Sequence, residues 1–215
     1  MSGSAIAASA WVAPSVLKID RVAAAVGTCG TPPVQIDWTA HAGTFPTSIT
    51  ANDGTAVSIA TNDPFGVADP SFLGLAFNGT TGALDNPIIM AMDNATGGDY
   101  TEIIFRFSQP VAPCFSMLDV DFGNFATGWQ DTILFDGTLS GAAVPLGAGD
   151  IVTSSGNTFV GPNEVVGTGN VANNSTNGQI DISYPAPINQ LSIRHVDSSA
   201  FNGFQYVGIH DFSWC

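Results

Sequence analysis

The heptapeptide TEIIFRF, residues 101–107, carries the clearest fold signal in the chain. In an extended strand Ile103, Phe105 and Phe107 share one face, and the charged Arg106 lies on the other. Strands with one apolar and one polar face are typical of antiparallel sheets that bury one side and expose the other to water. The stretch therefore predicts a half-buried antiparallel strand.

Runs of the same kind continue from Val34 to the end of the chain. NQLSIRHV (189–196) alternates in the same way, with Leu191 and Ile193 on one face. Short runs separated by turns rich in Gly, Asn, Asp and Pro are typical of a β-sandwich. We therefore expect residues 34–215 to form one all-β, antiparallel sandwich. The other runs are VQIDW (34–38), TAVSIAT (55–61), SFLGLAF (71–77), NPIIMAM (86–92), CFSMLDVDF (114–122), DTILFDG (131–137), GQIDISY (178–184) and FQYVGIHDFSW (204–214).

The composition agrees with a chain of strands and turns, and it restricts the partners. The chain has 24 Gly and 13 Pro, and only two of its 18 acidic residues are Glu, which favours helices more than Asp does. Four Lys and Arg oppose these acids, which leaves a net charge of −14. Nucleic-acid binding needs a basic footprint, so we expect no such partner. Lys18 interrupts the N-terminal apolar run well short of a membrane span.

Three cysteines, Cys29, Cys114 and Cys215, lie far apart without a CxxC pair. They allow one disulfide in any of three pairings with one thiol left over, or three buried free thiols in a reducing compartment. The surface composition is poor in Lys and rich in Asn, Thr and Gly, which favours the disulfide and a location outside the cell.

Residues 1–33 differ from the rest because they are rich in Ala and Val and nearly free of turn signals. The spacing of apolar residues within them fits a short helix that begins at Ser15 and ends at Gly27, whereas the β-branched content and the β-rich context favour an extended arm. An extended arm can add as a strand to a neighbouring subunit, and a contact of this head-to-tail kind builds filaments. The alternative is that the arm packs on its own domain. The side chains expected to fill a neighbour's pockets are Val16, Leu17, Ile19 and Val22.

The stretch FSMLDVDF, residues 115–122, places two aspartates inside an apolar run. If the strand continues through the run, Asp119 and Asp121 lie on one face with their Cα atoms about 6–7 Å apart. A glycosidase needs two acids that face each other across a cleft, and no opposing acid is evident. The chain has no Gly-x-Ser-x-Gly motif, and its three histidines are too scattered for a metal triad, so each is expected at the surface or paired on a strand. The sequence therefore predicts no enzyme.

Exposed aromatic side chains are the other candidate binding feature. Trp38 and Trp214 fall within strands, where burial is common, whereas Trp129 lies in the loop NFATGWQD. Phe201 and Phe204 lie close together in a second loop. These three loop side chains, Trp129, Phe201 and Phe204, are the candidate glycan contacts.

The order of motifs from Val34 to Trp214 resembles a known group of domains. Their pattern runs Phe-x-Phe-x-x-Pro-Val, Asp-hydrophobic-Asp, Asp-x-hydrophobic, then a Gly-x-hydrophobic strand and a closing Asp-hydrophobic-x-hydrophobic strand. The chain is similar in this order to jelly-roll-like β-sandwich domains of bacterial secreted and cell-surface proteins, found in envelope-sorted proteins and repeat-bearing adhesins. The resemblance implies a jelly-roll-like fold, an envelope or extracellular location and a non-catalytic role, but no known ligand. The matching stretches are IDW (36–38), YTEIIFRFSQPV (100–111), FSMLDVDFGN (115–124), WQDTILFDG (129–137), NGQIDISYPAPINQLSIRHV (177–196) and FQYVGIHDFSW (204–214).

A structural calcium ion is the candidate cofactor, because hard cations prefer several carboxylate and carbonyl oxygens from adjacent turns. Asp119, Asp121 and Asp131 supply such oxygens near one turn. The resemblance adds Asp211, since jelly-roll domains often bind calcium near the last strand. The alternative is that these aspartates cap turns at strand ends.

Together these expectations define two functions. The first is a non-enzymatic extracellular structural subunit that self-assembles into a filament or surface layer by exchange of the N-terminal strand. The second is a calcium-dependent carbohydrate-binding or adhesion module.

Overall fold

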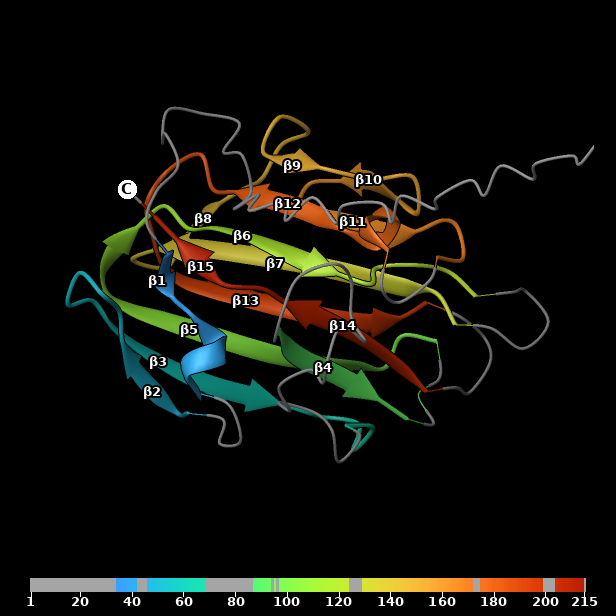
Figure 1. The fold of residues 1–215 in the computed structure, drawn as a ribbon, viewed down its shortest axis with the longest axis horizontal. Coiled ribbons are helices and arrows are strands. Elements are labelled where there is room, and N and C mark those ends of the chain that lie inside the picture. Colours follow the sequence, from blue (N-terminus) through green and yellow to red (C-terminus); the bar gives the residue numbers. More distant parts are fainter. Residues whose placement is uncertain are drawn as a thin grey trace, which may run out of the picture.

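The computed structural model describes residues 34–41, 46–68, 87–93, 95, 97–123, 129–171, 175–198 and 204–214. These residues form two antiparallel sheets and two short 3-10 helices, η1 (Trp38–His41) and η2 (Thr176–Gly178), and no α-helix lies among them. The prediction of an all-β antiparallel sandwich is confirmed (Figure 1).

The first sheet has seven strands. Its order is β1 (Val34–Ile36), β15 (Phe212–Ser213), β6 (Cys114–Leu118), β12 (Ile180–Ser183) and β9 (Ile151–Val152). β14 (Gln205–Ile209) also pairs with β6, and on its other side with β4 (Ile88–Met92). All these pairings are antiparallel.

The second sheet has eight strands. Its order is β10 (Asn157–Gly161), β11 (Glu164–Gly167), β7 (Asp131–Leu139), β13 (Ile188–Asp197), β5 (Tyr100–Val111), β3 (Ala56–Asn62) and β2 (Ser48–Thr50), with β8 (Ala142–Val144) also paired to β7. The longest ladders join β13 to its two neighbours, with His195 opposite Thr101 of β5 and Ile133 of β7. This register fixes which side chains of the three central strands meet.

The core lies between the two sheets and follows the predicted alternation. Ile103 and Phe105 are fully buried and Phe107 nearly so, whereas Arg106 is exposed. Leu191 and Ile193 of β13 are also fully buried. The largest contacts are aromatic: Phe212 meets Phe105, Phe115 and Trp38 edge to face, at ring-centroid distances of 4.7 to 5.9 Å. Such pairs contribute roughly 0.5–1.5 kcal/mol each beyond the area that they bury.

The strand at FSMLDVDF is shorter than its periodicity predicts. β6 ends at Leu118, and Asp119 has φ of 63°, in the left-handed region that few residues other than Gly, Asn and Asp adopt. The prediction of one unbroken face through Asp121 is therefore wrong, because the chain turns at Asp119. All five residues of β6 are buried, on both faces of the strand.

Several predictions concern residues outside those that the structure describes. These are the conformation of residues 1–33, with the candidate arm side chains Val16, Leu17, Ile19 and Val22, the run 71–77, and Phe201, Cys29 and Cys215. Cys114 is described, and it is a buried free thiol whose Sγ lies 3.2 Å from Ser183 Oγ.

Candidate functional site

One end of the sandwich collects buried acidic side chains. The end of β6, the start of β7, the end of β13 and the start of β14 all meet there. Asp131 N–H of β7 donates to the carbonyl oxygen of Asp121, three residues past the end of β6, at 3.1 Å. Asp197 of β13 lies opposite Asp131, and the charges of this region act on Tyr206 of β14. We call this region the acidic end. Its buried titratable residues are Asp119, Asp121, Asp131, His195 and Asp197.

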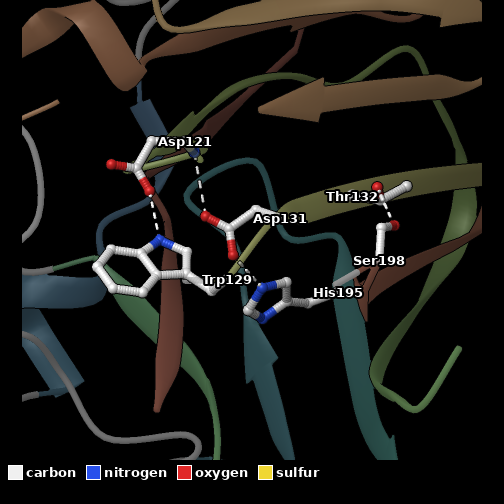
Figure 2. A network of polar contacts seen from close by, with 6 residues as sticks. All are labelled: Asp121, Trp129, Asp131, Thr132, His195 and Ser198. Carbon is white, nitrogen blue, oxygen red and sulfur yellow. Dashed lines mark hydrogen bonds and ion pairs between the residues drawn. The ribbon is translucent and has the colours of Figure 1, made fainter. Parts of the chain in front are cut away.

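Asp131 and His195 form the centre of the acidic end (Figure 2). Asp131 Oδ1 lies 2.8 Å from His195 Nε2, and both side chains are buried, with 1 % and 0 % of their surface exposed. Asp131 Oδ2 accepts the backbone N–H of Asp121 at 3.0 Å. Burial raises the pKa of Asp131, and the hydrogen bond from His195 offsets part of that rise. Both oxygens of this carboxylate are thus engaged by the protein.

Asp121 is held in the same way by two further donors. Its Oδ1 accepts the Trp129 indole N–H at 2.8 Å, and its Oδ2 accepts the backbone N–H of Val171 at 3.0 Å. Burial raises the pKa of Asp121, and these two hydrogen bonds oppose the rise. The backbone of Asp121 also approaches Gly167 so closely that a Cβ at that position would lie 1.8 Å from Asp121 O, which only glycine permits.

Asp119 differs from Asp121 and Asp131 because no hydrogen bond offsets the rise in its pKa. Burial raises its pKa to about 8, and the charges of Asp121 and Asp131 contribute to the rise. At neutral pH Asp119 is therefore largely protonated, chiefly because burial disfavours the charged form of its carboxyl group. This neutral acid reduces the buried negative charge of the acidic end.

Three side chains at this end, His195 among them, have polar atoms that meet no protein partner among the described residues. They are His195 Nδ1, Thr101 Oγ1 and both amide atoms of Gln205, and all three residues are nearly or fully buried. None of them was predicted as part of a site, and His195 was expected at the surface or paired on a strand. One signal was available, because His195 has the strand parity of the core residues Leu191 and Ile193.

Asp211, the fourth predicted calcium ligand, has other partners. Its Oδ1 accepts the backbone N–H of Trp38 at 2.9 Å, and its Oδ2 lies 4.0 Å from His210 Nε2. Burial raises its pKa to about 6, and the neighbouring charge that contributes is Asp37 rather than an acid of the acidic end. The structure thus brings Asp119, Asp121 and Asp131 together and gives Asp211 a capping role near β1.

The contacts of these carboxylates can be compared with the two interpretations of the aspartates, calcium binding and turn capping. Asp121, Asp131 and Asp211 each accept a backbone N–H, as the turn-capping alternative predicts. Within the described residues, no group of three or more His, Cys, Asp or Glu side chains is arranged to hold a metal ion. Asp53 and Asp63 cap turns as well, through the N–H groups of Thr55 and Val67.

The candidate glycan contacts differ in exposure. Trp129 is half-buried, and its indole N–H donates to Asp121, so this ring is tied to the acidic end rather than displayed. Phe204 is exposed, and its ring centroid lies 5.5 Å from that of Tyr206.

A second feature of the surface is a side of the sandwich where both sheets end. β9 is the last strand of the seven-stranded sheet and β10 of the eight-stranded sheet, and both lie along the top of Figure 1. Val152 of β9 and Val160 of β10 are among the most exposed large apolar side chains that the structure describes. We call this the open side.

In the part of the chain that the structure describes, no helix has the length and hydropathy needed to cross a membrane. Comparison of the chain with protein-family models, with curated proteins and with solved structures gave no match.

Proposed function

We propose that the chain is a non-enzymatic structural subunit that acts outside the cell and assembles with copies of itself through its N-terminal segment. The observation that carries this proposal is that the described sheets end in open strand edges, which offer backbone hydrogen-bonding groups to an added strand. The predicted strand-forming segment within residues 1–33 is the natural donor of that strand.

Charge supports the association of this segment with the sandwich. Residues 1–33 contain Lys18, Arg21 and the single acid Asp20, which gives a net charge of +1. Subtracting this from the total of −14 leaves −15 for residues 34–215. The segment and the sandwich therefore attract each other, and the attraction weakens with added salt.

The acidic end supports a non-enzymatic role. A general acid or base must reach a substrate proton, whereas Asp131 and His195 are buried and engaged with each other. Asp121 is likewise saturated by protein donors. The chemistry that this arrangement supports is the stabilisation of one end of the fold.

Deletion of residues 1–26 tests the assembly. We expect the full chain to sediment as a concentration-dependent series of oligomers and to form filaments or sheets in negative-stain micrographs, and the truncated chain to remain monomeric. A truncated chain that assembles like the full chain would overturn the proposal.

The second candidate is a calcium-dependent carbohydrate-binding or adhesion module. It is favoured by the proximity of Asp119, Asp121 and Asp131 and by the exposed ring of Phe204. A glycan array with calcium and with chelator tests it, and binding that chelator abolishes is the expected result. The module is excluded if no glycan is bound in calcium. A melting temperature that EDTA leaves unchanged argues against structural calcium.

A further inference from the structure

The described strands leave several sheet edges, and they differ in length and exposure. β1, β2 and β8 have three residues each and β9 has two. β4 has five residues, but all of them are buried. β10 also has five residues, and its outward side chains Thr158 and Val160 are exposed. Among the edges that the structure describes, β10 alone combines the length for a ladder with an accessible apolar side chain.

β10 lacks the side chains by which proteins protect an open edge, although its register with β11 shifts between Phe159 and Gly161. Such edges usually carry a lysine, a proline or an inward-facing charge that prevents pairing with another chain. The sequence of β10, NTFVG, has none of these. Val160 is 53 % exposed, and Val152 on the neighbouring edge strand β9 is 45 % exposed. The open side thus joins a backbone edge without protective charges or prolines to two exposed apolar side chains.

The charge of the open side is complementary to that of the N-terminal segment. Residues 141–185, which contain β9, β10, β11 and β12, include Asp150, Glu164 and Asp181 but no Lys, Arg or His. Glu164 lies opposite Gly161 of β10, and Asp150 directly precedes β9. A strand that brings Lys18 and Arg21 to this side meets acidic side chains there.

We infer that β10 is the acceptor edge, and that residues 12–26 of a second copy add to it as a strand. Apolar side chains of the added strand, such as Leu17 and Ile19, cover Val160 and Val152, and backbone hydrogen bonds supply the ladder. This inference rests on the proposed function and adds the surface at which it takes place.

We expect the contact between the donor segment and the β10 edge to form between two copies of the chain, because of where each joins the sandwich. Residues 1–33 join the sandwich at β1, which lies at the opposite end of the seven-stranded sheet from β9. Val160 and Val152 are exposed in the single chain, so they are accessible to a segment of another molecule. A donor at one side and an acceptor at the other make a head-to-tail contact that propagates into a filament.

The test is a lysine at the acceptor edge of the full chain, with a control of equal exposure. Val160→Lys places a charge on β10 that opposes both strand addition and the basic arm. Phe65→Lys adds the same charge at a side chain that is also 53 % exposed but contacts Tyr100 at the start of β5, away from the open side. Urea titration of both variants first establishes that they fold.

We expect Val160→Lys to raise the concentration needed for assembly at least about tenfold, as the loss of one central interface contact does. Phe65→Lys is expected to assemble as the wild type does. If Val160→Lys assembles normally while deletion of residues 1–26 abolishes assembly, the acceptor edge is a different one and this inference fails, but the proposed function stands. If the deletion also leaves assembly intact, both fail. Should Val160→Lys not fold, Val152→Lys on β9 provides the same comparison.

Discussion

Two contacts between a basic and an acidic side chain join the same pair of strands, β7 and β13, in opposite environments. Arg194 binds Asp136 on the outer face, where the two side chains are 32 % and 46 % exposed. The next residue, His195, points into the sandwich and binds Asp131, where exposure falls to 0 % and 1 %. Strand alternation alone separates the two pairs.

The comparison shows which of the two pairs the stability of the fold depends on. Water and salt screen the Arg194–Asp136 pair, and exposed pairs of this kind contribute about 0–1 kcal/mol. Asp131 and His195 have lost their hydration, so each depends on the other for a polar partner. Asp131 also depends on the backbone N–H of Asp121. The acidic end is therefore a constraint on the fold, and the open side is the surface that we propose for assembly.

His195→Ala gives the largest expected effect. It leaves Asp131 buried without a side-chain donor and opens a cavity, so the free energy of unfolding should fall by about 3–5 kcal/mol. Urea unfolding followed by circular dichroism measures this value. A loss below about 1 kcal/mol would mean that the pair is no more important than the exposed one.

An effect of similar size, spread over about four pH units, is the pH dependence that Asp119 causes. Its pKa is about 8 in the folded chain, against the ordinary value of 3.8 for an aspartate in an unfolded chain, so the folded state binds an extra proton between these limits. The free energy of unfolding should therefore fall as pH rises from about 4 to 8, by about 1.4 kcal/mol per pH unit from this group.

Asp119→Asn removes that contribution, since an amide resembles the protonated acid and Asn tolerates the left-handed φ of 63° at this position. Urea unfolding between pH 5 and pH 7 should show a shallower slope in the variant than in the wild type. Equal slopes would contradict the assignment of the proton to Asp119.

Asp121→Asn should have an intermediate effect. The amide can accept from only one of the two donors, Trp129 Nε1 or the Val171 N–H, and the other loses its partner. We expect a loss of about 1–3 kcal/mol and a change in Trp129 fluorescence, measured together in one urea titration. An unchanged emission spectrum would show that the indole does not depend on this carboxylate.

Arg194→Ala should have the smallest effect, below about 1 kcal/mol. The loss should shrink further in high salt, because both groups are partly exposed. Unfolding at low and high ionic strength checks this, and a large loss that salt does not change would place the pair in a less accessible environment than the structure does.

The fold was predictable because its signal is local. The alternation at TEIIFRF and NQLSIRHV identified the faces of β5 and β13. Trp38 and Trp214 are buried as predicted, but Trp38 begins η1 and Trp214 follows β15, so neither lies within a strand. The antiparallel class follows from such runs and the turns between them. The two strands pair with each other, which alternation alone does not specify.

The acidic end was only partly predictable, since it depends on contacts between residues distant in sequence. Asp119, Asp121 and Asp131 were recognised, but the partners of these acids were not: His195 is 64 residues from Asp131, and Val171 is 50 from Asp121. The left-handed turn at Asp119 was also missed, because strand periodicity carries no information on where a strand ends. Asp211 was grouped with the other acids by resemblance, whereas its hydrogen bond is to Trp38.

We would measure both unfolding and assembly for two variants, His195→Ala and Arg194→Ala. The two measurements together test whether the acidic end supports the fold or forms the functional surface. If the acidic end supports the fold, His195→Ala loses at least about 2 kcal/mol more than Arg194→Ala in urea unfolding, and both variants still assemble under conditions where they are folded. A His195→Ala variant that keeps its stability but no longer assembles would contradict this, because the acidic end would then be the functional surface.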